Sequence, residues 1–206
     1  MFNDPPPSPF PYGQNPDEPK KPDDQAPQRV SNNPTSIRVP DKSSRGVFAT
    51  GVLIIHGPQE LVLDFIQGLA RPAQLVARVV ITPPVAEQLL TTLQENYSRY
   101  TKSFGQPPAL PKPPPEPRKS PQEIYDELKI SDDMLSGAYA NAVMVGHTPA
   151  EFHVDFVTSF FPNAAVSSRV YVAAPRMPQF IETLTLSIAN YRRQQQQQPP
   201  RPPQAP

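Results

Sequence analysis

The sequence predicts an α+β protein made of two tandem repeats, each with antiparallel strands followed by one amphipathic helix. A shift of 91 residues places positions 46–102 on positions 137–193 without a gap, which indicates an internal duplication. Within each repeat, β-branched and alternating segments precede one long segment with helical spacing of apolar residues. Most of the 32 prolines lie outside the matched stretches. We therefore expect two folded repeats packed as a pseudo-dimer, with disordered Pro-rich tails and linker.

Composition narrows the functional classes. Among 206 residues, 19 are basic and 19 acidic, and this zero balance argues against a nucleic-acid partner, which usually requires a basic excess. The chain has no cysteine, so disulfides and thiolate metal sites are excluded. The first residues lack the features of a signal peptide, and no apolar run is long enough to span a membrane. We expect a cytoplasmic protein that binds no membrane and no cofactor.

The domain boundaries follow from changes in composition. Segments rich in Pro, Asn and Gln cannot bury enough apolar surface to fold, and a Pro-rich linker is stiff and extended. We expect a disordered Pro-rich tail at 1–35, the first repeat at 36–105, a Pro-rich linker at 106–120, a short helix and the second repeat at 121–193, and a disordered Gln/Pro-rich tail at 194–206. The N-terminal sequence PPPSPFPYG is either a solvated spacer or a short linear ligand.

Each repeat is expected to form a β-hairpin followed by a third strand. In the first repeat, the strands cover 47–56, 60–66 and 76–82, and a Gly-Pro-Gln turn joins the first two. In the second repeat, they cover 139–146, 151–157 and 167–173. The segments 36–41 and 127–132 alternate apolar and polar residues and predict one short extra strand in each repeat.

One amphipathic helix is expected to close each repeat. The first helix opens after Thr82, whose hydroxyl can cap it, has Pro83 and Pro84 in its first turn, and ends at Gly105. In the second repeat, apolar residues from Met177 to Tyr191 form the corresponding stripe. A further short helix at about 121–128 is indicated by a capping box with Ser120 at its start.

The motifs of the repeat resemble a known family. The second repeat reads G-x-Y-A-N from Gly137, then H-T-P-x-E-F-x-x-D-F from His147, then S-R-V-Y-V-A-x-P before the helix. With this order, each repeat resembles a bacterial domain-of-unknown-function family, number 3467. Departures from the pattern are Thr50 and Leu61 in the first repeat and Ser187 in the second. The resemblance implies a small non-membrane domain and implies no reaction.

Two histidines are candidate site residues. His56 and His147 end the first hairpin strands, and each precedes a glutamate by four residues, Glu60 and Glu151. Two imidazoles and two carboxylates could contribute to a metal site. The spacing on a hairpin is not that of a helical zinc motif, however, and neither repeat supplies a clear third ligand. We therefore expect each imidazole to hydrogen-bond to its turn, with no metal.

Two aspartate–arginine pairs recur at the same places. Asp64 and Arg78 lie on neighbouring predicted strands, as do Asp155 and Arg169, and each pair can face the same side of the sheet. We expect cross-strand ion pairs that set the register or line the interface between the repeats. The alternative is a charged pocket or a catalytic acid.

The remaining candidates are polar or aromatic residues at an interface. They are Asn96, Tyr100, Asn141 and Tyr191. The chain shows no Ser-His-Asp arrangement, phosphate loop or cysteine nucleophile. We expect a non-enzymatic binding or assembly protein with an unknown protein partner. The alternatives are a small-ligand or metal-binding enzyme that uses the histidines and Asp/Arg pairs, and a chaperone-like strand-pairing module.

Overall fold

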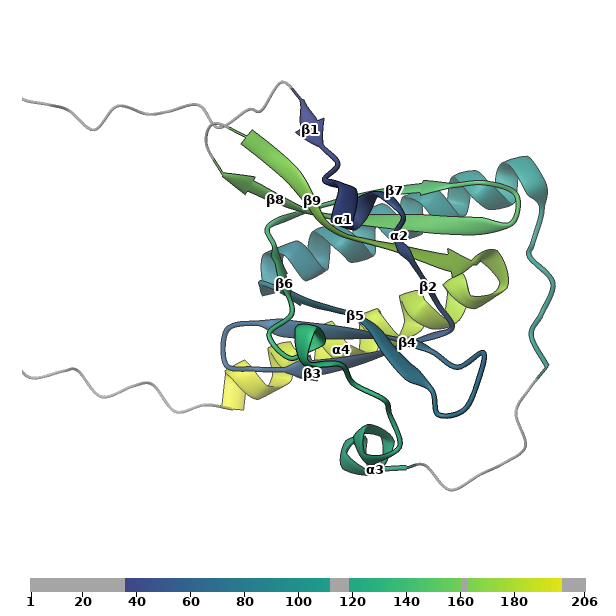
Figure 1. The fold of residues 1–206 in the computed structure, drawn as a ribbon. Helices are drawn as coiled ribbons and strands as arrows, with labels where there is room; N and C mark the ends of the chain where they lie inside the picture. Colours follow the sequence, from purple (N-terminus) through teal and green to yellow (C-terminus); the bar gives the residue numbers. More distant parts are fainter. Residues whose placement is uncertain (1–35, 112–118, 161–162, 198–206) are drawn as a thin grey trace, which may run out of the picture. The chain divides into compact units, whose positions relative to one another are not determined.

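Two sheets and two long helices form the core of the computed structural model, which describes residues 36–111, 119–160 and 163–197 (Figure 1). The described residues fall within one compact unit, Asn32–Pro206. The first repeat contains β1 (Ile37–Arg38), α1 (Asp41–Ser44), β2 (Val47–Ala49), β3 (Gly51–His56), β4 (Leu61–Gln67), β5 (Gln74–Ile81) and α2 (Pro83–Phe104). The second contains α3 (Pro121–Asp126), η1 (Asp132–Met134), β6 (Ala138–Ala140), β7 (Ala142–His147), β8 (Glu151–Phe160), β9 (Asn163–Ala173), η2 (Ala174–Arg176) and α4 (Met177–Gln197).

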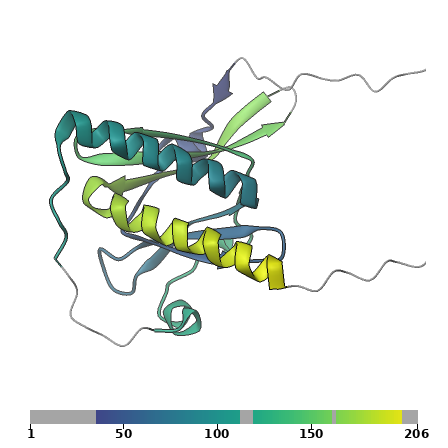
Figure 2. The same ribbon diagram turned by 180° about the vertical axis from the view of Figure 1, so that it is seen from behind.

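The α+β class and the two tandem repeats are confirmed. One sheet has the order β1-β9-β8-β7, with β2 also paired to β9, and the other has the order β3-β4-β5-β6. Helices α2 and α4 lie side by side across the strands (Figure 2). The predicted tail at 1–35, the linker residues 112–118 and the end of the chain from 198 lie outside the described residues.

The two repeats exchange strands. β2 belongs to the first repeat but pairs in parallel with β9 of the second, with Val47 opposite Val170. Reciprocally, β6 of the second repeat pairs in parallel with β5 of the first, with Ala138 opposite Val79. The two registers become identical when one is shifted by 91 residues. The repeats are therefore related by a pseudo-twofold axis and form the expected pseudo-dimer within one chain.

The prediction of one continuous strand at 47–56 is wrong. The chain breaks at Thr50, so that β2 and β3 lie in different sheets, and the segment 139–146 breaks in the same way at Asn141. At each break, a polar side chain bonds to the backbone at the end of the next strand. Thr50 Oγ1 accepts from the Gly68 N–H at 2.8 Å, and the Asn141 amide bonds to both Ser159 backbone groups at 2.8 and 3.0 Å.

Strand spacing explains why the exchange is obligatory. β3 lies beside β4 on the side away from β5. To reach the free edge of its own β5, β2 would have to lie three strand spacings, about 14 Å, from β3. Only Thr50 separates β2 from β3, and one extended residue spans about 3.5 Å. β2 can therefore pair only with the sheet of the other repeat.

The helices also cross between repeats. α2 packs on β7 of the second repeat, and α4 packs on β3 of the first. The buried rings continue this mixing, since Phe65 of the first repeat lies 5.7 Å from Phe156 and 5.8 Å from Phe180 of the second, measured between ring centroids. The main core cluster thus contains side chains of both repeats, and a smaller cluster lies around Val157 and Val166. None of the helices in the described ranges is long and apolar enough to cross a bilayer.

Two details of the helix ends differ from the predictions. Thr82 is the N-cap of α2 but forms no side-chain cap bond, and Pro84 at the second helical position has no N–H to donate. α4 continues to Gln197, into the segment predicted as a tail from 194. Within this extension, the Gln195 side chain donates a hydrogen bond to the Pro58 carbonyl of the first repeat at 2.9 Å. The capping box between Ser120 and Glu123 is confirmed.

Candidate functional site

Both expected ion pairs are present. Arg78 Nε and Nη2 donate to the two carboxylate oxygens of Asp64 at 2.8 and 2.7 Å, directly across β4 and β5. Arg169 Nε and Nη2 bind Asp155 in the same way at 2.7 and 2.6 Å, across β8 and β9. These bidentate pairs are charge-assisted and fix the relative orientation of both side chains.

The carboxylates are buried and the arginines are only partly so. The Asp64 side chain is 0% exposed and that of Arg78 is 18% exposed; the corresponding values for Asp155 and Arg169 are 5% and 21%. The hydrogen bonds from each arginine to its carboxylate raise the arginine pKa in both pairs. Arg78 also donates Nη1 to the Leu135 carbonyl of the second repeat at 3.1 Å. This pair therefore joins two strands and the two repeats at once.

Tyr125 adds a third group to the first pair. It lies on α3, and its hydroxyl donates a hydrogen bond to Asp64 Oδ2. Burial of the ring, followed by this hydrogen bond, raises the pKa of Tyr125 to about 12. Every oxygen of the Asp64 carboxylate thus accepts a hydrogen bond from within the fold, which is the arrangement of a structural link.

A polar groove runs between the repeats where the two ion pairs approach one another. Its volume is about 220 Å³, and Arg78 and Arg169 both line it, together with Gly46 and Gly137 of the exchanged segments. Both glycines have positive φ, +64° and +70°. The sequence contained a signal for these two residues, because they align with each other at the start of the gapless match.

The expectation that the hairpin histidines bond to their turns is wrong. His56 packs edge-on against Tyr191 at 6.3 Å and His147 against Tyr100 at 5.7 Å, measured between ring centroids. Nε2 of His56 and Nδ1 of His147 are buried and lack a hydrogen-bond partner among the described residues. The first turn is closed by a backbone hydrogen bond instead, in which the Gly57 N–H donates to the Glu60 carbonyl at 2.9 Å.

Burial lowers the pKa of His56. The glutamates that follow the histidines by four residues bond to the turns. Glu60 accepts a hydrogen bond from the Gln59 N–H at 3.1 Å, and Glu151 accepts one from the Thr148 hydroxyl at 3.2 Å. Both glutamates therefore stabilise hairpin turns. Within the described ranges, no three His, Cys, Asp or Glu side chains gather in a group that could hold a metal ion.

The tyrosines of the two long helices join the repeats. The Tyr100 hydroxyl donates to the Pro149 carbonyl at 3.0 Å, and the Tyr191 hydroxyl donates to the Pro58 carbonyl at 3.2 Å. Each bond links a helix of one repeat to the hairpin turn of the other. Asn96, by contrast, is buried and donates to the Thr92 carbonyl within its own helix at 2.9 Å.

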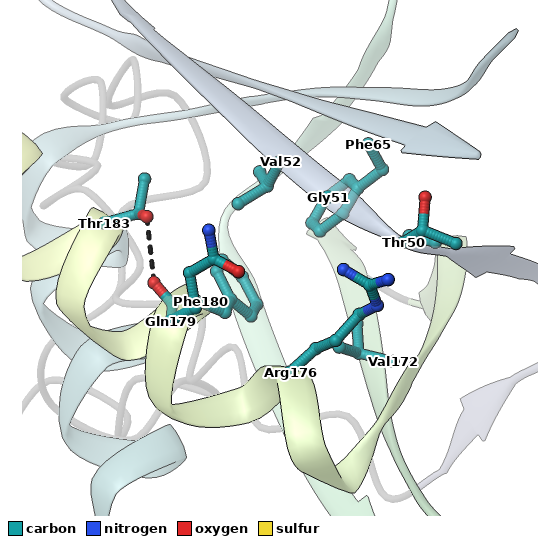
Figure 3. A pocket seen from close by; sticks show the side chains of 10 residues that line it. Thr50, Gly51, Val52, Phe65, Val172, Arg176, Gln179, Phe180 and Thr183 are labelled. Atoms are coloured by element: carbon teal, nitrogen blue, oxygen red, sulfur yellow. Dashed lines mark hydrogen bonds between the residues drawn. The ribbon is translucent and has the colours of Figure 1, made fainter. Parts of the chain in front are cut away.

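Sequence reasoning missed a cavity at the start of α4 (Figure 3). Its volume is about 140 Å³, and residues of both repeats line it. The side chains of Arg176 and Gln179 extend from the helix towards Gly51 and Val52. A signal was present at the 91-residue offset, where Arg176 corresponds to Val85 and Gly51 to Ala142. These differences mark a place where the two repeats are not equivalent.

Comparison with known proteins gives one family. The family model described as "Protein of unknown function (DUF3467)" matches the chain twice, at residues 14–107 and 111–197. No curated protein and no solved structure matches the chain. The two matches correspond to the two repeats and confirm the tandem arrangement expected from the resemblance.

Proposed function

The chain belongs to the DUF3467 family of proteins of unknown function and carries its domain twice, and we propose that it is a non-enzymatic assembly protein. In this proposal, molecules associate through the outer strands of their two sheets. The partner is a second molecule of the same chain, and the contact is antiparallel strand addition. The arrangement of the charged candidates supports a role without catalysis, because the carboxylates of Asp64 and Asp155 bind arginines within the fold.

The observation that carries the proposal is the character of β3 and β7. Each strand is the outermost of its sheet and pairs on one side only with a described strand. Each has six residues without a charge or a proline, GVLIIH in β3 and AVMVGH in β7. Exposed edge strands usually carry charges, prolines or bulges that prevent pairing with other chains. These two carry none and are suited to accept another strand.

A second molecule fits β3 well. An antiparallel pair about a twofold axis centred on Ile54 would place Leu53 of one molecule opposite Ile55 of the other, with both side chains on the same face. This contact joins apolar residues to apolar residues and satisfies the free backbone groups of both edges. Because β7 offers an equivalent edge in the other sheet, contacts of both kinds would link molecules into linear assemblies.

The test is sedimentation velocity of the full chain over a range of concentrations. We expect concentration-dependent association of the natural chain. Ile55 and Met144 are each 39% exposed, and Ile55→Lys and Met144→Lys introduce a charge at one edge each. Each variant should shorten the assemblies, and the double variant should be monomeric.

The control is Leu186→Lys on α4, a helix side chain that is 54% exposed and belongs to neither edge strand. It should associate like the natural chain. A natural chain that stays monomeric at about 100 μM, well above the Kd of an ordinary specific contact, overturns the proposal. Association that survives the double substitution overturns the assignment to these strands.

A further inference from the structure

The cavity at the start of α4 combines one cation with an apolar wall. Figure 3 shows the Arg176 guanidinium near Thr50 and Gly51, with the Gln179 side chain on the other side of Phe180. Phe65, Phe180 and two valines form most of the remaining wall. The cavity is therefore amphipathic, with Arg176 and Thr50 towards one end and Gln179 and Thr183 towards the other.

Arg176 is partly buried and has no counter-charge among the residues that the structure describes. It forms no hydrogen bond or ion pair with the described residues, whereas Arg78 and Arg169 are each paired with a carboxylate. No Asp or Glu is among the residues that line the cavity. A guanidinium stays charged at any ordinary pH and offers parallel N–H groups that match a carboxylate. The cavity thus favours an anion, and a planar one in particular.

The wall and the volume of the cavity limit the size and polarity of the part of the ligand that lies beyond its carboxylate. This cavity is partly open to solvent and measures about 140 Å³, close to the volume of about 150 Å³ at which a buried apolar cavity holds one benzene molecule. The aromatic and aliphatic wall favours an apolar body over a second charge. Gln179 can donate an amide N–H to a second oxygen of the bound group.

We propose that this cavity binds a small monocarboxylic acid whose apolar body is no larger than one aromatic ring. The carboxylate lies between Arg176 and Gln179, and the body lies against Phe65 and Phe180. The site occurs once per chain, because Val85 and Ala142 stand at the positions equivalent to Arg176 and Gly51. The cavity includes Gly51 and Val52 of β3, so the acid is proposed to bind beside the edge strand that the pairing proposed above uses.

The experiment is a titration of the full ¹⁵N-labelled chain, followed by amide chemical shifts. The probe is benzoate, and benzyl alcohol is a neutral ligand with the same ring. We expect saturable shifts at Thr50, Gly51 and Thr183 with benzoate, at one ligand per chain. Benzyl alcohol should bind at least about tenfold more weakly, because it cannot form the charge-assisted pair. This comparison uses the natural chain alone, and equal affinity for the two probes overturns the proposal.

Variants and a second ligand test the assignment. Arg176→Gln should weaken benzoate binding at least about tenfold, and the matched control Arg99→Gln, an exposed arginine on α2, should leave it unchanged. Unchanged benzoate affinity in Arg176→Gln overturns the site. The dipeptide acetyl-Gly-Phe has the same carboxylate on a larger body and should bind more weakly than benzoate. Tighter binding of the dipeptide identifies a peptide end as the ligand and overturns the small-acid proposal.

Discussion

Gly137 of the second repeat lies directly against the side chain of Arg78 in the first. A Cβ atom on Gly137 would stand 2.8 Å from Arg78 Cγ, and the φ of +70° is itself unfavourable for any other residue. Gly46 repeats this contact with Arg169 at 2.9 Å. The exchanged segments therefore cross the ion pairs at van der Waals contact, and each crossing requires a residue without a side chain.

Gly137→Ala should destabilise the protein by about 2–4 kcal/mol, through backbone strain together with the clash on Arg78. Gly105→Ala is the matched control, because Gly105 also has positive φ, +78°, but has no heavy atom within 4 Å of its Cβ position. It should cost less, about 1–2 kcal/mol of backbone strain, because no clash adds to it. Urea denaturation measures both. Equal losses in the two variants would mean that the close approach to Arg78 contributes nothing.

Removal of either partner of an ion pair should have unequal effects. Arg169→Ala leaves the Asp155 carboxylate, which is 5% exposed, without its cation, and should cost about 3–5 kcal/mol. Asp155→Ala should cost less, because Arg169 is 21% exposed and can turn towards water. Arg99→Ala removes a surface pair with Glu95 and should cost under about 1 kcal/mol. Chemical denaturation of the three variants should give this order, and a reversed order for the first two contradicts the burial argument.

The tyrosine bonds across the repeats should contribute modestly to stability. Tyr100→Phe removes the bond to the Pro149 carbonyl, and because Tyr100 is only 4% exposed, the loss should be about 0.5–1.5 kcal/mol. Tyr97→Phe is the control, since its hydroxyl donates to the side chain of Gln106, just after the same helix, at an exposed site. It should be close to neutral. Thermal unfolding of both variants decides whether the bond between repeats carries the larger effect.

Acid should weaken the fold through His56. Burial lowers its pKa below the ordinary 6.5, so the unfolded chain takes up a proton at a higher pH than the folded chain does. The stability that neutral His56 contributes is complete above pH 6.5, and it is lost as the pH falls from there through the pKa of His56 in the folded chain. The free energy of unfolding of the natural chain, minus that of His56→Phe, should therefore fall as the pH is lowered from about 7.5 to 5.5. Groups that both proteins share contribute equally to the two curves, and a constant difference contradicts the prediction.

Neither repeat should be stable as an isolated monomer. A polypeptide of residues 36–105 contains β2 without β9 and α2 without β7, so its apolar helix stripe remains exposed. Residues 121–197 have the reciprocal deficit. Each alone should be unstable or should form a dimer with its own kind, and an equimolar mixture should form a 1:1 complex. Sedimentation of the two parts tests this, and two stable monomers without mutual affinity contradict the exchange.

The sequence by itself determined the duplication and the internal equivalences. The gapless match paired Asp64 with Asp155 and Arg78 with Arg169, and alternation on the strands predicted that each aspartate faces its arginine. It also located both long helices, because apolar spacing of 3.6 residues persists over many turns. These features are local in sequence, or separated by one hairpin, so a pattern of residue types is enough to specify them.

Only the tertiary structure decided which repeat receives each strand. A run of apolar β-branched residues has the same periodicity whether it is one strand or two, so the breaks at Thr50 and Asn141 left no signal in the pattern. The partner of β2 follows from the distance between strands, which is a property of the assembled sheets. The same holds for His56, which packs on a tyrosine of the other repeat, and for Arg176, whose cavity forms only where both repeats meet.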